Sequence, residues 1–566
     1  MGFAKMSART TATAALLIAV VAATGCRKTP ENLPVHTLIY GGDVTIARNL
    51  NTALFDKKTR DGMLGELAPL LSGADIALAN AEGVIAEGGR YTHKGEPRPH
   101  MYRAAPEAVD LLKSAGMDVV TVGNNHAGDY GPKAYIEMLD RLTDAGIGYT
   151  GGGENLADAE TPYYQKVGDT IVAVVGGDIT ITEPVRALPN RAGPLYFGMH
   201  MHSSAAESKE LIETLKRILK EARKHAHVVL FTPHWGDNWL TEPTPAIRMV
   251  AKAIIKLGYD GIIGHSAHLF QGVELIDGKP VIYDAGNLLL DYGGGDDAHR
   301  GLLWELSFNR AGITQIAGHP IWMEENRSMP AEGKVREKIL SDVQKRSKAM
   351  GTALDIEDDM AYALCKPGEI EGPSDTPDPP RRKVEEVRTA PSDLIVDKLP
   401  EDATPVDVRW ENGVRLIGYQ LLIQEHSVPK SGQFVVLYWT ADKPVKDGFT
   451  VHLEARWTDP KTGKMKKNFA PHLPGDWIFP AERWPAGKII KDWTLFRLDF
   501  RPPVGDVDFY AGMYRNRLIE PKSSDVELTD EKLVHLGTTA YRKGAKNIFD
   551  YLKQYETQKG ELGVYH

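Results

Sequence analysis

The stretch Val119–Gly131, VVTVGNNHAGDYG, joins an apolar strand to a polar turn. Val119–Val122 form a short apolar run of the kind found in buried strands. The run leads directly into Gly123–His126, and Asp129 follows three residues later. In α/β folds, functional side chains collect just after the strands, at one edge of the sheet. The stretch therefore predicts a sheet domain together with the place where its chemistry lies.

The same pattern recurs on both sides of this stretch, between residues 35 and 325. Helix-like stretches at 105–115, 211–222 and 247–257 carry apolar residues on one face and separate successive apolar runs. Alternating strands and helices predict an α/β domain over residues 35–325. The predicted strands are Thr37–Tyr40, Ile76–Ala79, Val119–Val122, Ile171–Val175, Val228–Phe231 and Gly261–Ile263.

Side chains of the kinds that bind metal ions follow five of these strands. They are Asp43, Glu82, Asn125, His234, His265 and His268. Because strand ends converge at one edge of an α/β sheet, these side chains can meet around a metal ion. A mixture of carboxylate, amide and imidazole ligands suits Zn, Mn or Fe. It does not suit a metal site that selects thiolate ligands. Each residue alone is more often a cap, a turn or a hydrogen-bonded structural residue than a metal ligand, but five such segments together favour a metal centre.

The order and the amino-acid sequences of these segments resemble those of a known family. GDVTIAR, NAEG, GNNHAGDYG, HWG and GHSAH occur in that order, as in the CapA family, which is linked to bacterial capsule and poly-γ-glutamate synthesis. That family belongs to the calcineurin-like metallophosphatase superfamily. The resemblance covers about residues 36–325 and implies a four-layer αββα sandwich with two divalent metal ions at the loop end.

The resemblance also implies a role for each matching residue. Asp43, Glu82, Asn125, His234, His265 and His268 are the implied metal ligands, with Glu82 at the bridging-carboxylate position. His126 resembles the proton donor, Asp129 would orient it, and Arg48 would face an anionic substrate. The chain departs from the pattern at several positions: Thr45 stands where the superfamily has a histidine ligand, Ala81 stands where the family usually has leucine, and Ser266 and Ala267 replace the usual histidine and proline of the last motif.

These departures leave three functions open. The first is a metal-dependent hydrolase acting in capsule, poly-γ-glutamate or other exopolymer handling, on a phosphoester or an amide. The second is a non-catalytic scaffold or polymer-binding subunit of an exopolymer synthase that keeps the fold. The third is a nucleotidase-type phosphatase. The expected partners are an anionic polymer or phosphoester and envelope proteins of polymer synthesis.

Composition excludes several other classes. The 566 residues are 42% apolar and 25% charged, which is an ordinary globular balance. The net charge of −9 gives no domain-wide basic excess, so nucleic acid is not an expected partner. Two cysteines, Cys26 and Cys365, cannot build a multi-bridge disulfide scaffold.

The first 26 residues have the features of a bacterial lipoprotein signal. Lys5 and Arg9 precede the apolar run at 14–23, which is too short to span a bilayer and is typical of a secretory signal. The run ends in Ala-Thr-Gly-Cys26, which resembles a lipobox. We expect Cys26 to be lipidated and to anchor the protein in the cell envelope, on the periplasmic face. Arg27, rather than Asp, after the cysteine favours the outer membrane; an ordinary cleaved signal is the alternative.

The second half of the chain changes character. Residues 326–404 predict a charged helix at 331–349 followed by a linker rich in Pro and acidic residues. Residues 405–540 contain short strands between turns, which predict an all-β sandwich, and residues 541–566 predict a helical tail. Trp477, Trp484 and Trp493 allow a sugar-stacking role, although core or turn positions are favoured.

Overall fold

The computed structural model describes residues 33–541, except for 93–99, 181–184, 198–204, 291–294, 325, 374, 376–377, 380–381, 423–432 and 497–504. The expected signal with Cys26 and nearly all of the expected helical tail lie outside these residues. Within them, no helix combines the length and apolar character needed to cross a bilayer.

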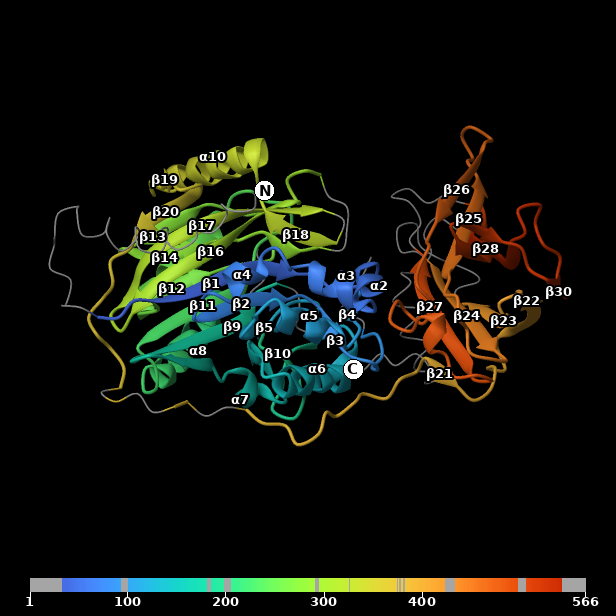
Figure 1. The fold of residues 1–566 in the computed structure, drawn as a ribbon, viewed down its shortest axis with the longest axis horizontal. Helices are drawn as coiled ribbons and strands as arrows, with labels where there is room; N and C mark the ends of the chain where they lie inside the picture. Colours follow the sequence, from blue (N-terminus) through green and yellow to red (C-terminus); the bar gives the residue numbers. More distant parts are fainter. Residues whose placement is uncertain are drawn as a thin grey trace, which may run out of the picture. The chain divides into compact units, whose positions relative to one another are not determined.

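The α/β domain contains two large sheets (Figure 1). The first has the order β19-β20-β17-β16-β1-β2-β5-β6, with β15 beside β1 and β18 beside β17. The second has the order β13-β14-β12-β11-β9-β8. The first sheet consists of β1 (His36–Val44), β2 (Ile76–Ala81), β5 (Val119–Thr121), β6 (Gly148–Thr150), β15 (Asn287–Leu289), β16 (Arg300–Asn309), β17 (Gly312–Glu324), β18 (Arg327–Pro330), β19 (Asp355–Glu357) and β20 (Met360–Leu364). The second consists of β8 (Tyr163–Val167), β9 (Thr170–Asp178), β11 (Val228–His234), β12 (Gly261–Ile263), β13 (Val273–Ile276) and β14 (Lys279–Ile282).

Side chains alternate between the two faces of each strand, which divides the buried apolar residues into three separate cores. Leu38 and Tyr40 of β1 pack with Val172 and Leu230 of the second sheet in a core between the sheets. Ile39 instead faces the outer core, which contains residues of α5 (Ala108–Ser114) and α6 (Gly131–Asp144). A third core lies between the second sheet and two helices, α8 (Ala205–Ala222) and α9 (Pro245–Leu257). The mixed α/β class is thus confirmed, and its layers run helix, sheet, sheet, helix.

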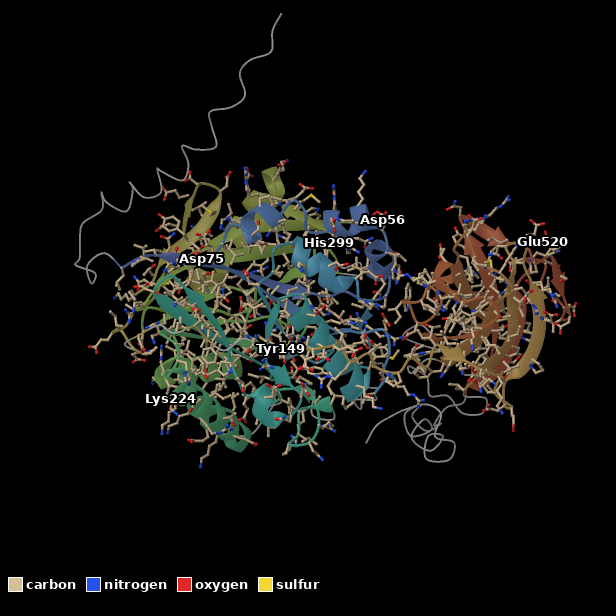
Figure 2. The ribbon with its side chains drawn as sticks, turned by 60° about the horizontal axis from the view of Figure 1, so that its bottom comes forward. Asp56, Asp75, Tyr149, Lys224, His299 and Glu520 are labelled. Carbon is tan, nitrogen blue, oxygen red and sulfur yellow. The ribbon has the colours of Figure 1, made fainter. Side chains whose placement is uncertain are left out.

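Shorter elements complete this part of the chain. They are α2 (Leu50–Leu54), α3 (Lys57–Gly62), α4 (Ala68–Leu71), α7 (Leu156–Ala159), β3 (Val84–Ile85), β4 (Arg103–Ala104), β7 (Gly152–Gly153) and β10 (Gly193–Pro194). The expected helix at 331–349 is α10 (Gly333–Ala349). Two strands after it, β19 and β20, still belong to the first sheet. Figure 2 shows side chains filling both sheet regions, with Tyr149 labelled in β6.

The later part of the chain forms two antiparallel sheets, as expected of an all-β segment. A six-stranded sheet has the order β21-β27-β24-β23-β22-β30, and a five-stranded one contains β26-β25-β28-β29 with β31 beside β28. Trp439 and Trp484 pack in the core that both sheets share. The strands are β21 (Ile395–Val396), β22 (Thr404–Arg409), β23 (Val414–Leu421), β24 (Gln433–Ala441), β25 (Thr450–Thr458), β26 (Met465–Phe469), β27 (Ile489–Phe496), β28 (Gly505–Arg515), β29 (Arg517–Ile519), β30 (Ser523–Ser524) and β31 (Val534–Tyr541), with a 3₁₀ turn at Ala481–Arg483.

Candidate metal centre

The ends of several strands bring five of the expected ligands together. Two groups of ligand atoms, each within 4.8 Å of one another, are formed by Asp43, His234 and His265 and by Asp43, Glu82 and His268. Asp43 belongs to β1, and His234 is the last residue of β11. Asp43 is common to both groups, whereas Glu82 belongs to one of them. All five side chains are buried, none being more than 5% exposed.

The buried histidines have the features of cation ligands. Within the described part of the chain, His234 Nδ1 and His265 Nε2 are buried and have no hydrogen-bond partner. An unpaired buried polar atom costs about 1–3 kcal/mol, so a cation bound to both atoms and to Asp43 would remove that cost. The donor set of imidazole and carboxylate suits Zn, Mn or Fe, and the residues therefore fit the divalent metal that the sequence predicts.

The charges of the group are arranged around Asp43. Burial opposes the charge on His268, but Glu82 and Asp43 raise the pKa of His268 to about 10. Burial would raise the pKa of Asp43, yet His268, His265 and His234 hold it below its ordinary value. Burial lowers the pKa of His265 to about 4 and that of His234 well below 6.5. His234 and His265 are thus neutral, with lone pairs available to a metal.

Neighbouring polar groups fix the carboxylates. Asn80 donates from Nδ2 to Asp43 Oδ1 at 2.8 Å, and the Ser266 amide donates to Asp43 Oδ2 at 3.2 Å. Thr45, at the position where the resemblance predicts a histidine, donates from Oγ1 to Glu82 Oε2 at 2.5 Å. The threonine therefore orients a carboxylate through a hydrogen bond.

A close backbone approach positions Asp43 itself. A Cβ atom at Gly42 would lie 1.7 Å from the carbonyl oxygen of Gly286. The Asp43 amide donates to that same oxygen at 3.1 Å. Only glycine at position 42 allows the end of β1 to pack this closely against the 284–287 turn.

His126 and Asp129 form a buried pair in the turn that follows β5. His126 Nδ1 lies 2.8 Å from Asp129 Oδ2, which also accepts from the Tyr102 amide at 2.9 Å. The Tyr102 ring lies 4.0 Å from the His126 ring, and the Arg48 guanidinium lies 5.2 Å from the Tyr102 ring centre. Tyr102 thus contacts all three of the expected catalytic residues, His126, Asp129 and Arg48. Asn125, the remaining expected ligand, precedes His126 in the same turn.

Several residues that orient the ligands were not predicted as site residues. Asn287 Oδ1 lies 3.1 Å from His268 Nδ1, and its Nδ2 donates to the His268 carbonyl at 3.0 Å. Tyr40 OH lies 3.0 Å from His265 Nδ1. Asp284 Oδ2 accepts from the Ala267 amide at 2.7 Å. Asp284 and Asn287 follow β14, so the polar-residue-after-strand pattern could have identified them; Tyr40 lies inside an apolar strand and carries no such signal.

The backbone around the centre is unusual. Arg48, Trp239, Ser266 and His268 all have positive φ, at 41°, 70°, 114° and 60°. Non-glycine residues rarely adopt this region, and such conformations gather at functional sites where the surroundings enforce them. Two of these residues were predicted to serve the site, and Trp239 is a further neighbour, its ring centre 5.5 Å from that of His268.

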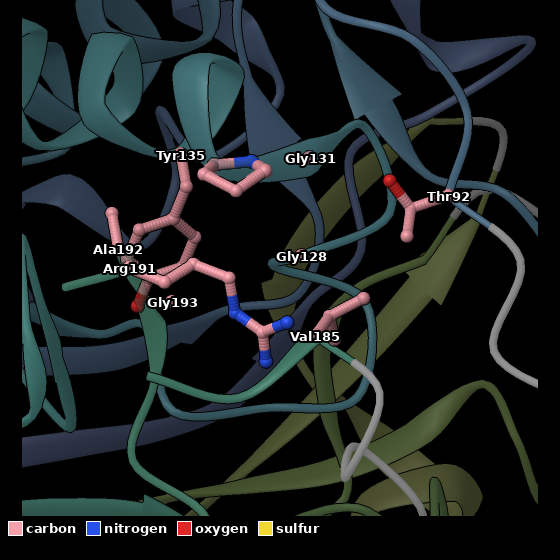
Figure 3. Close-up of a pocket in the computed structure, with 9 residues that line it drawn as sticks. Thr92, Gly128, Gly131, Tyr135, Val185, Arg191, Ala192 and Gly193 are labelled. Carbon is pink, nitrogen blue, oxygen red and sulfur yellow. The ribbon is translucent and has the colours of Figure 1, made fainter. Parts of the chain in front are cut away.

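A small crevice beside the 126–131 turn is not a substrate site (Figure 3). Its lining includes Tyr135, Val185 and Arg191, and its cavity volume is about 10 Å³. That volume holds at most about one water molecule. Arg191 donates to the Arg186 carbonyl oxygen from Nε and Nη2, at 3.1 and 2.7 Å, so its guanidinium serves the local backbone.

Comparisons with known proteins agree with the resemblance. Residues 37–292 match the family described as "Bacterial capsule synthesis protein PGA_cap". The chain is 26% identical over 286 residues to the capsule biosynthesis protein CapA of Bacillus anthracis, covering 49% of this chain and 67% of the relative. It is 26% identical over 255 residues to the PGA biosynthesis protein CapA of Bacillus subtilis (strain 168), covering 45% and 63%.

The match thus spans about two thirds of the length of these curated relatives. Among solved structures, a hypothetical protein from Thermus thermophilus is 16% identical, covering 51% of this chain and 100% of that chain, with a TM-score of 0.32.

Proposed function

We propose that the protein is a metal-dependent hydrolase of exopolymer synthesis. We start from the match of residues 37–292 to the bacterial capsule synthesis family PGA_cap. The substrate class would be an anionic polymer of the poly-γ-glutamate type. One observation carries the proposal: His234 and His265 each bury a ring nitrogen that has no hydrogen-bond partner, and both side chains belong to one group of possible ligands with Asp43. Imidazole and carboxylate donors of this kind suit a divalent metal.

The chain's own residues supply the rest of the chemistry. Asp43, His234 and His265 would hold a divalent metal, which when bound would supply Lewis-acid polarisation and a water-derived nucleophile at neutral pH. His126, held through Nδ1 by Asp129 at 2.8 Å, would give a proton to the leaving group from its other ring nitrogen. Arg48, beside Tyr102, would attract a substrate carboxylate or phosphate.

The scaffold alternative rests on one observation. Thr45, which donates to Glu82, contributes a hydroxyl where the resemblance predicts an imidazole ligand, and a weaker metal site would favour binding over turnover. The two functions differ in a measurable way, because a scaffold binds polymer without cleaving it.

The experiment combines metal analysis with turnover on the purified full chain. Asp43→Asn and His234→Ala should each lower bound metal at least tenfold and abolish hydrolysis of poly-γ-glutamate and of a test phosphodiester. His225→Ala, whose side chain is 58% exposed, is the matched histidine control and should behave as wild type. Metal binding without cleavage of either substrate would support the scaffold. Failure of the wild type to bind metal would refute the metal centre.

We also propose that the protein works at the cell envelope. The features that support this are the basic start, the apolar run at 14–23 and Cys26 after a small residue. An anchored hydrolase on the periplasmic face would meet polymer and the envelope proteins that synthesise it.

A further inference from the structure

Two residues that contact His126 are followed in the chain by residues that contact each other. The Tyr102 ring lies against His126 with ring centres 4.0 Å apart, and Asp129 Oδ2 lies 2.8 Å from His126 Nδ1. Arg103 follows Tyr102, and Tyr130 follows Asp129. The Arg103 guanidinium lies 4.3 Å from the centre of the Tyr130 ring. The two segments that hold His126 thus meet one residue beyond their contacts with it.

One carboxylate of the β-sandwich binds both of these neighbours. Asp476 Oδ2 accepts a hydrogen bond from Arg103 Nη2 and another from the Tyr130 hydroxyl, the latter at 2.9 Å. All three residues are buried, none being more than 6% exposed. A buried guanidinium that loses its carboxylate partner is strongly destabilised. The position of Arg103 therefore depends on Asp476.

The turn that carries Asp476 is held in place by the β-sandwich. Asp476 and Trp477 have positive φ, at 52° and 72°, a conformation that non-glycine residues keep only where their surroundings enforce it. The Gly475 amide donates to Asp492 Oδ1 of β27 at 2.9 Å. The Asp476 carboxylate is thus presented by a fixed turn of the sandwich.

The ion pair lies beside an apolar contact between the sandwich and the turn that contains His126. Trp493 of β27 is 6% exposed, and its ring centre lies 6.5 Å from that of Tyr130 and 6.3 Å from that of Tyr91. Phe434 of β24 belongs to the same core as Tyr91, Tyr130 and the apolar residues of α6. Isolated surface ion pairs contribute little, but this pair is buried against a packed core.

We propose that Asp476 is a positioning residue for His126, and that the β-sandwich thereby completes the candidate catalytic centre. Through Arg103 it fixes Tyr102, and through Tyr130 it fixes Asp129. Asp476 lies outside residues 37–292, which match the family, so this support comes from a part of the chain beyond the matched domain. The inference rests on the proposed function for the role of His126, but its first test needs no turnover.

The first measurement is hydrogen–deuterium exchange of the full chain at pH 8, read by mass spectrometry in peptides that contain Tyr102 and Asp129. Burial raises the pKa of Asp476 to about 7, against the opposing effect of Arg103, so the carboxylate is largely ionised at pH 8. Asp476→Asn removes the charge and keeps a residue type that tolerates positive φ. We expect exchange in these peptides to be at least fivefold faster than in wild type, because the local structure opens more often. Tyr130→Phe, which removes a single hydroxyl, should give a smaller increase in the same peptides.

Two other carboxylates provide matched controls. Glu107 pairs with Arg483 of the sandwich, so Glu107→Gln removes an ion pair between the same two parts of the chain. Asp140, which is 4% exposed, pairs with Arg388, so Asp140→Asn removes a similarly buried charge. Both controls should leave exchange in the two peptides within about twofold of wild type.

The second measurement separates the orientation of His126 from a loss of folded protein. It compares two phosphodiesters that differ only in the leaving group, one releasing 4-nitrophenolate and the other a simple alcohol. The alcohol oxygen must receive a proton as its bond to phosphorus breaks, whereas 4-nitrophenolate leaves without one. Asp476→Asn should therefore lower kcat/KM for the alcohol substrate at least tenfold more than for the nitrophenyl substrate. A smaller folded fraction would lower both rates equally.

Three results would overturn the positioning role. They are unchanged exchange around Tyr102 and Asp129 in both Asp476→Asn and Tyr130→Phe, an equal increase in Glu107→Gln, and an equal loss of rate on the two substrates. If wild type hydrolyses neither diester, the proposed hydrolase is contradicted, and exchange alone decides whether Asp476 holds the residues around His126.

Discussion

At the scale of single residues, the candidate metal centre depends on side chains that hold the expected ligands in place. His268 has a φ of 60°, a backbone conformation that costs energy unless its surroundings enforce it. Asn287 supplies two constraints, since it contacts both the ring nitrogen and the carbonyl of His268. It also donates to the Ala298 carbonyl at 3.3 Å, which fixes the amide itself.

Replacing Asn287 by alanine should therefore weaken metal binding without removing a ligand. We expect a loss of about 10–100-fold in metal affinity, the usual cost of removing a group that orients a metal-bound histidine. Competition with a fluorescent chelator measures it. Asn309→Ala is the matched control, since Asn309 Oδ1 accepts a local hydrogen bond from the Ala311 amide. Unchanged affinity in Asn287→Ala would show that His268 needs no such support.

At the scale of elements, a buried His–Asp pair connects the two sheets of the β-sandwich. His472, which is 2% exposed, forms a backbone bridge to Val451 of β25. Its Nε2 lies 3.0 Å from Oδ2 of Asp492 on β27. Burial works against a charged His472, but Asp492 raises its pKa above the ordinary value. The carboxylate therefore favours the charged form of His472.

This pair predicts a pH dependence of stability. A histidine whose folded pKa exceeds about 6.5 stabilises the fold fully below the unfolded pKa, and the contribution is lost as pH rises through the folded pKa. The difference in Tm between wild type and His472→Asn should thus be largest near pH 6 and shrink toward alkaline pH. His535→Asn is the control, because that side chain is 45% exposed. A difference that does not change with pH would mean that His472 is neutral.

The elements also show what the sequence can and cannot predict. Apolar runs located β1, β2, β5, β9, β11 and β12, and one-sided periodicity located α5, α8 and α9, to within a few residues at most ends. The long strands β16 and β17 were also not among the predicted strands. Strands β18–β20 escaped prediction because they are short and lie toward one edge of the sheet, where packing on one side leaves little hydrophobic pattern. Candidate ligands could be predicted because they follow strands. Tyr40 could not, because its contact with His265 exists only once two sheets pack together.

At the scale of the whole molecule, the Pro- and acid-rich segment predicted as a linker makes specific contacts. Arg388 donates to both carboxylate oxygens of Asp140, each at 2.7 Å, and pairs with Glu154. The Ala390 amide donates to buried Glu137 Oε2 at 2.7 Å. The sandwich adds a buried ion pair between Arg103 and Asp476, which also accepts from Tyr130 OH at 2.9 Å. Tyr130 follows Asp129, so these contacts reach the residue next to the expected proton-donor pair.

The expected membrane anchor is also a property of the whole molecule. The two cysteines allow a matched test of it, because only Cys26 is expected to carry lipid. Each methylene of an acyl chain buried in a bilayer contributes about 0.8 kcal/mol, so two or three chains on Cys26 would hold the protein at a membrane against high salt. We expect wild type in the membrane fraction with incorporated radiolabelled palmitate, and Cys26→Ser without label. Cys365 is buried, and burial raises its pKa to about 12, so Cys365→Ser should keep both label and location. Membrane fractionation of Cys26→Ser at the mature mass would mean that a different part of the chain provides the anchor.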